Sequence, residues 1–163
     1  MYNNKYKCSK CGNSFIEKEV INIDDKYICL KCIYGDTEPV EIYPIGIVKN
    51  NLHRNQTPFG IRGDGSISRI ELISSQKPFI YKVIEERYLT IVYYLHKSTS
   101  VKSIFKRGYD GKKVGVFASR TPYRLSKIAI QDVKLIKVDG TTLYVEGLDA
   151  IDGSPVLDIK MKI

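Results

Sequence analysis

Four cysteines stand in two pairs near the start of the chain. Each pair has the form Cys-x-x-Cys, and the four residues are Cys8, Cys11, Cys29 and Cys32. Two such turns can direct four thiolates at one metal ion, with Zn–S bonds of about 2.3 Å. The spacing predicts a closed, structural zinc site of the ribbon type. Iron in the same cage is one alternative, and two disulfides or redox pairs in an exported protein are the other.

The N-terminal residues argue against export. Met1–Cys8 contains neither the apolar core nor the small-residue cleavage site of a signal peptide. Disulfides persist mainly in oxidising compartments, so this favours a metal over disulfides. No apolar run approaches the roughly 20 residues that cross a bilayer. We therefore expect a cytoplasmic protein with no membrane partner.

A second chemically distinct group of residues is basic. The chain of 163 residues has 26 Lys and Arg against 18 Asp and Glu, a formal net charge of +8. Residues 1–38 are formally neutral, whereas residues 97–124 carry eight basic residues against Asp110. Tyr109 and Tyr123 lie among them, which suits contacts with phosphates and stacking on bases. A solvated basic loop is the alternative. The predicted nucleic-acid contacts are Lys102, Lys106, Arg107, Lys112, Lys113 and Arg124.

The elements that position these groups fall into two predicted domains. A zinc-ribbon module over residues 1–38 should end near Pro39, and a domain over residues 39–163 should follow. The second domain has short β-branched or aromatic runs bounded by Gly, Pro, Asn and Asp, without a sustained helical period. This pattern is typical of an antiparallel barrel or sandwich, so the fold class should be mainly β. The predicted strands are Ile42–Lys49, Ser66–Ile73, Tyr88–His96, Lys113–Ser119, Lys127–Val138, Thr141–Glu146 and Pro155–Met161.

Two short segments connect these predicted strands. Asp139-Gly140 stands between two strand-like runs and predicts a two-residue hairpin turn. Pro78–Arg87 is expected to hold a short helix.

Two longer motifs carry a family resemblance. Residues 115–124 read Gly-Val-Phe-Ala-Ser-Arg-Thr-Pro-Tyr-Arg, and residues 147–160 read Gly-Leu-Asp-Ala-Ile-Asp-Gly-Ser-Pro-Val-Leu-Asp-Ile-Lys. With Tyr43–Val48, Thr57–Gly60 and Tyr93–Lys97, they resemble the TsaA-like family, often called TrmO, from about Ile42 to Lys160. The resemblance implies an antiparallel β-barrel and a homodimer. It also implies S-adenosylmethionine-dependent methylation of tRNA, at the N6 of a threonylcarbamoyl-modified adenosine beside the anticodon.

The resemblance further implies a cofactor site built from separated segments. On this reading Asp149 accepts from the ribose or the ammonium of S-adenosylmethionine, and Arg120 pairs with a carboxylate or phosphate. His96 either binds the cofactor or removes the substrate proton. The alternatives are a turn residue for Asp149, a loop residue for Arg120 and a strand-end histidine for His96. The expected cofactor-binding residues are Pro58, Phe59, Gly60, His96, Lys97, Arg120, Ile130, Glu146, Gly147, Leu148 and Asp149.

Two departures from the family pattern leave a second function open. The first motif usually continues Arg-Pro-Asn-Pro-Ile-Gly, whereas residues 124–129 read Arg-Leu-Ser-Lys-Ile-Ala. Losing the Pro-Asn turn removes a fixed backbone and an amide side chain. The family's C-terminal extension is also expected to be missing after Lys160. The alternative is therefore a non-catalytic module that binds nucleic acid or protein. We expect the enzyme, because a scaffold alone has no need for His96, Arg120 and Asp149 together.

Overall fold

The computed structural model describes residues 4–53 and 65–163. The chain divides into two compact units, one formed by residues 1–41 and 98–126 and the other by residues 42–97 and 127–163. We call residues 1–41 the cysteine module and residues 98–126 the basic arm. The arm is inserted between two strands of the second unit. The predicted domain boundary between residues 38 and 39 stays a prediction, because it concerns whether the parts on either side fold independently.

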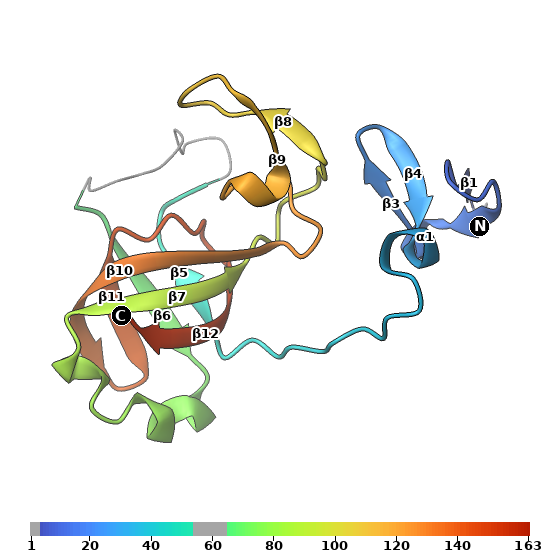
Figure 1. Ribbon diagram of the computed structural model, residues 1–163. Helices are drawn as coiled ribbons and strands as arrows, with labels where there is room; N and C mark the ends of the chain where they lie inside the picture. The colour runs from blue at the N-terminus through green and yellow to red at the C-terminus, as the bar shows by residue number, and fades with distance from the viewer. Residues whose placement is uncertain (1–3, 54–64) are drawn as a thin grey trace. The chain divides into compact units, whose positions relative to one another are not determined.

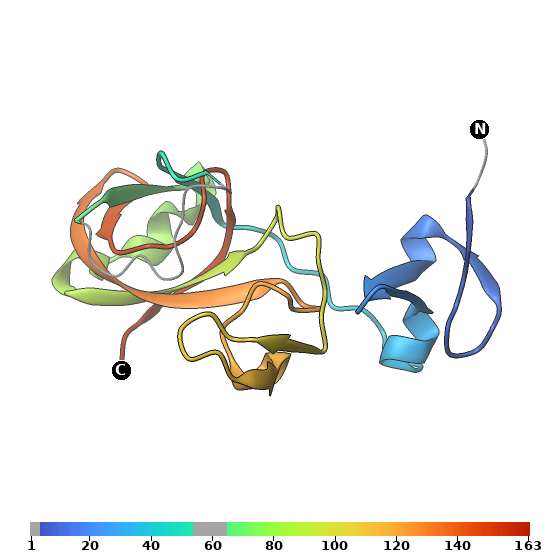
Figure 2. The ribbon, with the colours of Figure 1, turned by 90° about the horizontal axis from the view of Figure 1, so that it is seen from above.

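Six antiparallel strands of the second unit form a closed barrel (Figure 1). Their order around the barrel is β10-β11-β6-β5-β12-β7, and β7 closes it by pairing with both β10 and β12. Figure 2 shows β7 and β10 side by side from a second direction. The predicted mainly β fold and antiparallel barrel are confirmed. The strands are β5 (Gly46–Lys49), β6 (Ile67–Leu72), β7 (Tyr88–Tyr94), β10 (Ile128–Asp139), β11 (Thr142–Glu146) and β12 (Pro155–Met161).

The barrel core follows from the alternation of side chains along its strands. In β7 the side chains of Leu89, Ile91 and Tyr93 are buried, and the residues between them are more exposed. Successive residues of a strand face opposite sides, so the period of two in the sequence fills the interior. The buried core comprises Val48, Ile70, Leu72, Leu89, Ile91, Tyr93, Val133, Leu135, Leu143, Val145, Leu148, Ala150 and Val156.

The hairpin between β10 and β11 is present, but its turn lies one residue later than predicted. Asp139 still pairs with Thr142, so Gly140 and Thr141 form the two-residue loop. Gly140 has a φ of 60°. Glycine with positive φ at the first central position is the arrangement of a type II′ turn, which matches the twist of the strands.

Two other predicted elements differ in the structure. The expected helix over Pro78–Arg87 is replaced by two 3₁₀ helices, η2 (Ser74–Ile80) and η3 (Val83–Glu85). Lys82 separates them with a φ of 62°, a left-handed conformation that a helix cannot continue through. The strand expected from Ile42 begins only at Gly46, after Pro44, which has no amide hydrogen to donate. In Figure 1 the green η2 and η3 lie at one end of the barrel, where β6 finishes and β7 begins.

The cysteine module consists of two small hairpins, one 3₁₀ turn and one short α-helix. Between residues 4 and 41 only Cys8 and Cys29 are buried. The module therefore has no apolar core of its own. Its elements are β1 (Lys5–Lys7), β2 (Ser14–Ile16), η1 (Glu17–Glu19), β3 (Val20–Ile23), β4 (Lys26–Cys29) and α1 (Leu30–Tyr34).

The basic arm carries its own hairpin, formed by β8 (Ile104–Lys106) and β9 (Lys113–Gly115). The predicted strand Lys113–Ser119 is wrong beyond Gly115, where the chain turns into the 3₁₀ helix η4 (Val116–Ala118). Ser119 causes this turn, because its amide and its hydroxyl both donate to the carbonyl oxygen of Val116, at 3.2 and 2.9 Å.

In the described part of the chain, no helix has the length and apolar character needed to cross a bilayer.

Candidate functional site

The four cysteines meet at one point of the cysteine module. Cys8 and Cys11 lie at the turn after β1, Cys29 ends β4, and Cys32 lies in α1. Their four sulfur atoms all lie within 4.8 Å of one another, and the Sγ atoms of Cys11 and Cys29 are 3.9 Å apart. Four sulfurs held tetrahedrally at about 2.3 Å from one ion would be about 3.8 Å apart. The cluster therefore has the dimensions of a four-thiolate metal site.

Backbone amides support the sulfur of Cys8. The amides of Lys10 and Cys29 donate to its Sγ at 3.4 and 3.3 Å. Backbone hydrogen bonds from Cys11 and Cys29 lower the pKa of the Cys8 thiol to about 6. Hydrogen bonding to Cys29 raises the pKa of Cys32 to about 12. All four cysteines are free rather than disulfide-bonded, so a cation binding all of them must displace protons.

A second cluster of polar residues lies where β5, β7 and β11 finish, at the opposite end of the barrel from η2 and η3. His96 follows β7 there, with its Nδ1 3.4 Å from the hydroxyl oxygen of the buried Ser154. Gly153 packs beside the ring, since a Cβ at that position would lie 3.6 Å from His96 Nε2. Burial lowers the pKa of His96, and Lys97 lowers it further. The imidazole is therefore neutral at physiological pH.

The segment from Gly147 to Asp149 follows β11 and is held by one side chain of β10. Gln131 donates from Nε2 to the carbonyl oxygen of Gly147 at 2.6 Å and accepts from the amide of Asp149 at 2.8 Å. A side-chain amide that bonds two backbone groups in this way fixes the intervening chain. Gly147 has a φ of 87°, so the segment turns sharply out of β11.

Asp149 is the residue of this segment with unused hydrogen-bonding capacity. Its side chain is half-buried, and burial raises the pKa of its carboxyl group. Among residues 4–53 and 65–163, no group donates a hydrogen bond to this carboxylate. The buried Tyr93 lies close enough for the charge of Asp149 to add to the raised pKa of its phenol, which burial mainly causes. A half-buried carboxylate without a donor is suited to a cationic or hydroxyl-bearing ligand.

Asn50, directly after β5, fixes the remainder of the loop between β11 and β12. Its amide nitrogen donates to the carboxylate of Asp152 at 3.0 Å. Its side-chain Nδ2 donates to the carbonyl oxygen of Ala150 at 2.8 Å and to the hydroxyl of Ser68 at 2.9 Å. The loop that carries Asp149 is thus held from β10 and from β5.

Sequence reasoning missed both of these supporting residues. A signal for Gln131 was present, because it stands in phase with the inward-facing Ala129, Val133 and Leu135 of β10. A polar residue in an apolar inward register needs a buried partner. Asn50 gives no comparable signal, since its partners are 18 and about 100 residues away along the chain.

The other predicted cofactor residues are distributed more widely. Ile130 lies on the outer face of β10, opposite Gln131, and is half-exposed. Leu148 is buried in the barrel core. Glu146 forms an ion pair with Lys134 at 3.6 Å. The structure thus brings His96, Gly147 and Asp149 to one barrel end, whereas Ile130 faces away from its interior.

Three further predictions concern residues that are exposed or that lie outside the barrel unit or the described residues. Arg120 and Lys97 are exposed, and Arg120 belongs to the basic arm rather than to the barrel unit. Pro58, Phe59 and Gly60 lie outside the described residues.

A cavity of about 330 Å³ lies at the other barrel end, lined by η2, η3 and Asp158 among others.

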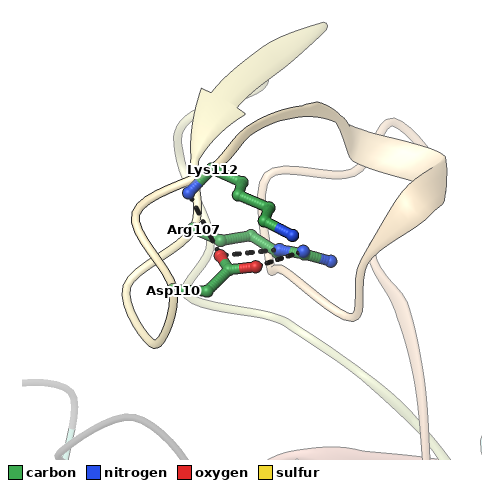
Figure 3. Close-up of polar contacts among 3 residues, drawn as sticks. All are labelled: Arg107, Asp110 and Lys112. Atoms are coloured by element: carbon green, nitrogen blue, oxygen red, sulfur yellow. Dashed lines mark hydrogen bonds and ion pairs between the residues drawn. The ribbon is translucent and has the colours of Figure 1, made fainter.

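The basic arm divides its cations into partnered and exposed ones. Arg107 forms a two-point ion pair with Asp110, at 3.1 and 2.5 Å, and the amide of Lys112 donates to the same carboxylate at 3.1 Å (Figure 3). This pairing raises the pKa of Arg107 and lowers that of Asp110. Arg124 donates to the carbonyl oxygens of Val116 and Ser119. Both arginines therefore hold the fold of the arm.

The lysines of the arm are more available to a ligand. Lys106, Lys112 and Lys113 are exposed. Lys102 is exposed too, and its Nζ lies 4.9 Å from the centre of the Tyr123 ring. Exposed lysines on a hairpin, with Lys102 beside an aromatic ring, fit a polyanion better than a compact neutral ligand.

Comparison with known proteins places these features in a family. A family model described as the tRNA-methyltransferase O N-terminal domain matches residues 52–162. The chain belongs to the TrmO family. The family resemblance expected from the sequence is confirmed, and the cysteine module lies outside the matched residues.

Named relatives of this TrmO-family chain include archaeal and mammalian proteins. An S-adenosyl-L-methionine-binding protein of Archaeoglobus fulgidus is 31% identical over 118 residues, which cover 72% of this chain and 85% of that protein. The tRNA (adenine(37)-N6)-methyltransferase of Mus musculus is 51% identical over 51 residues, which cover 31% of this chain and 12% of that protein. The mouse match is therefore strong but short.

A solved structure of the TrmO family shares the fold. A crystal structure of TrmO superimposes with a TM-score of 0.63 at 22% identity, covering 77% of this chain and 58% of that one. This chain therefore spans little more than half the length of the TrmO chain of known structure.

Proposed function

We propose that this chain is an S-adenosylmethionine-dependent methyltransferase acting on tRNA, at the N6 of a threonylcarbamoyl-modified adenosine next to the anticodon. The observation that carries the proposal is the half-buried Asp149 carboxylate, which has no donor in the described chain and shares a barrel end with His96. The names of the Archaeoglobus and mouse relatives support the cofactor and the adenine acceptor. A cytoplasmic location and a homodimer belong to the same proposal.

The residues at this barrel end fit the cofactor by their donor and acceptor chemistry. Asp149 would hold its ammonium or ribose hydroxyls, and the backbone of Gly147 and Leu148 would lie against its adenine. S-adenosylmethionine supplies an electrophilic methyl group when bound, so the protein has no need of a covalent nucleophile. What the chain must provide is orientation and a proton acceptor. Arg120, Lys97, Glu146, Ile130 and Pro58–Gly60 stay in the proposed site as predictions.

His96 is proposed as the proton acceptor. Its lowered pKa leaves the ring neutral, and the proposed role uses the tautomer in which Nδ1–H donates to the Ser154 hydroxyl and Nε2 accepts the proton from the nitrogen that is methylated. Glycine at position 153 keeps a side chain from covering that nitrogen.

Direct measurement of cofactor binding and methyl transfer tests the proposed function. We expect heat of binding on titration of the full chain with S-adenosylmethionine. We also expect transfer of a labelled methyl group into tRNA that carries the threonylcarbamoyl modification, and none into tRNA that lacks it. Absence of binding at millimolar cofactor would exclude the enzyme and favour a non-catalytic module.

Replacing His96 by glutamine should reduce the rate of methyl transfer about 10²- to 10⁴-fold, the usual contribution of a general base. The affinity for S-adenosylmethionine should change far less. In the wild type the rate should fall as the pH drops through the lowered pKa of His96, because an imidazolium cannot accept a proton. Single-turnover rates across pH and calorimetry measure the two quantities. Equal losses of rate and affinity would make His96 a cofactor ligand instead.

The basic arm is proposed to bind the phosphates of the tRNA. Reversing the exposed Lys112 and Lys113 to glutamate should weaken tRNA binding and flatten its salt dependence. Each lost phosphate contact removes about 0.7 to 0.9 from the slope of log affinity against log salt. Lys77→Glu, in η2, with Lys82→Glu, between η2 and η3, makes the same charge change and should leave the slope unaltered. Filter-binding titrations at several salt concentrations measure both. Equal effects of the two pairs would assign the binding to net charge alone.

Zinc is proposed as the structural ion of the cysteine module. The four sulfurs have the spacing that a tetrahedral ion needs, and amides already donate to Cys8. Iron fits the same donor set, and metal analysis of the purified protein separates the two ions.

A further inference from the structure

The turn between β3 and β4 breaks a local rule of hairpin chemistry. Ile23 pairs with Lys26, so Asp24 and Asp25 form a two-residue loop, and both have positive φ values, 49° and 63°. Such turns favour Asn-Gly or Asp-Gly, so Asp24 is usual at the first position, whereas Asp25 stands where glycine is preferred.

Asp24 makes four contacts with the basic arm, all within the first compact unit. Its carboxylate accepts from the amide of Ser103, 3.2 Å from each oxygen, and from the hydroxyl of Ser103. Its own amide donates to the carbonyl oxygen of Val101 at 3.3 Å. The neighbouring Ile23 forms a parallel bridge with Val101. We call this set the Asp24 contact.

The residues that receive the Asp24 contact also hold the rest of the arm together. The amide of Lys102 donates to the carbonyl oxygen of Tyr123 at 3.1 Å, and the carbonyl oxygen of Ser103 accepts from Val116 at 3.0 Å. Residues 101–103 thus join the cysteine module to the beginning and the end of the arm. Val101 is buried at this junction.

Charge makes the contact favourable. The basic arm has seven Lys and Arg against Asp110, whereas residues 1–38 are formally neutral before any metal is bound. Four thiolates and one divalent ion would make the module net negative. A negative module bound at the base of a positive hairpin stabilises it by attraction and leaves the lysines of the hairpin exposed to a polyanion.

We propose that the cysteine module is an internal support for the basic arm: the Asp24 contact fixes the arm in the conformation that binds RNA. The metal at the four cysteines then controls RNA affinity through the fold of the module, without touching the RNA. This inference rests on the proposed function, in which the arm binds tRNA.

Two glycine substitutions in the turn separate this role from turn stability. Asp24→Gly relieves the positive φ and removes the carboxylate, whereas Asp25→Gly relieves the positive φ and keeps the contact. In this chain loaded with zinc we expect Asp24→Gly to weaken tRNA binding about five- to tenfold, from loss of charge-assisted hydrogen bonds. Hydrogen exchange at the amide of Ser103 should accelerate by a similar factor. Asp25→Gly should match the wild type in both.

Chelation supplies a second, independent measurement. Removing the metal from the wild type should lower tRNA affinity by about the same factor as Asp24→Gly, and the two together should lose little more than either alone, because both remove the hydrogen bonds between the Asp24 carboxylate and Ser103. Ser103→Ala tests the arm side of the contact if Asp24→Gly impairs folding.

The possible failures can be told apart. Equal tRNA affinity and equal Ser103 exchange in the two glycine variants would overturn the support role while leaving the proposed function intact. A wild-type protein that binds no tRNA at low salt would overturn both the proposed function of the arm and its control by the module. In that case the exchange at Ser103 still shows whether the Asp24 contact forms.

Discussion

Removing the proposed zinc ion from this chain should unfold the cysteine module and leave the barrel folded. The reason is that Cys8 and Cys29 are the only buried residues between positions 4 and 41, so the proposed metal centre would take the place of a core. Structural zinc contributes about 10 to 16 kcal/mol of apparent binding free energy in small modules, and without it such modules are unfolded. The barrel has its own apolar core and needs no ion.

Nuclear magnetic resonance of the amide groups, before and after chelation under reducing conditions, measures this outcome. Resonances of residues 5–34 should collapse to the narrow range of an unfolded chain, those of β7 and β10 should stay dispersed, and added zinc should restore the first set. Cys32→Ala should behave like chelation, and Ser9→Ala, which lies between Cys8 and Cys11 but removes no sulfur, should keep the module folded. Dispersed module resonances in the reduced, metal-free protein would refute the structural role.

The barrel was predictable from the sequence because its information is local. Strand β7 alternates buried Leu89, Ile91 and Tyr93 with more exposed residues, and this period of two can be read without knowing the partners of the strand. The hairpin between β10 and β11 carries a glycine in its turn for the same kind of local reason.

The arm was harder to predict because its form depends on particular side chains. The run Val116–Ser119 has the composition of a strand, yet the two hydrogen bonds from Ser119 to Val116 close it into a turn. Arg124 then binds the same carbonyl oxygen from eight residues away. Strand propensity is a weak preference, and a short-range hydrogen-bonded turn overrides it.

The candidate site shows the same division between local and distant information. The cysteine spacing predicts its cluster, since the chemistry lies within two short turns. Gln131 and Asn50 hold the Asp149 loop only because barrel closure brings together segments 16 to 102 residues apart. No local sequence pattern predicts which segments the barrel closure brings together, so only the structure identifies these hydrogen-bond partners.

Replacing Asp149 by asparagine should weaken S-adenosylmethionine binding about 10- to 100-fold. Asparagine keeps the size of the side chain but removes its charge, and a hydrogen bond to a charged group contributes about 1.5 to 3 kcal/mol. The effect should be large because the described chain offers this half-buried carboxylate no donor of its own, so the ligand would supply the missing partner. Calorimetric titration of the full chain measures the loss.

Asp158→Asn is the matched control for this substitution. Asp158 lines the cavity at the other barrel end and already forms an ion pair with Lys160 at 2.6 Å. Losing its charge should leave cofactor affinity unchanged.

Gln131→Glu tests the support of the Asp149 segment. The variant keeps an acceptor for the Asp149 amide but loses the donor to Gly147. The affinity of this variant for S-adenosylmethionine should lie between those of the wild type and Asp149→Asn.

The pH dependence of binding identifies Asp149 as the group responsible. Burial raises the pKa of its carboxyl group, so the charged form that attracts the ligand is present above that pKa and is lost as the pH falls through it. Wild-type affinity for S-adenosylmethionine should therefore decline toward acidic pH, as the Asp149 carboxylate takes up a proton. In Asp149→Asn this component of the decline should be absent, because no carboxyl group remains there to titrate. A decline of the same size in both proteins would transfer the cofactor contact to another acid.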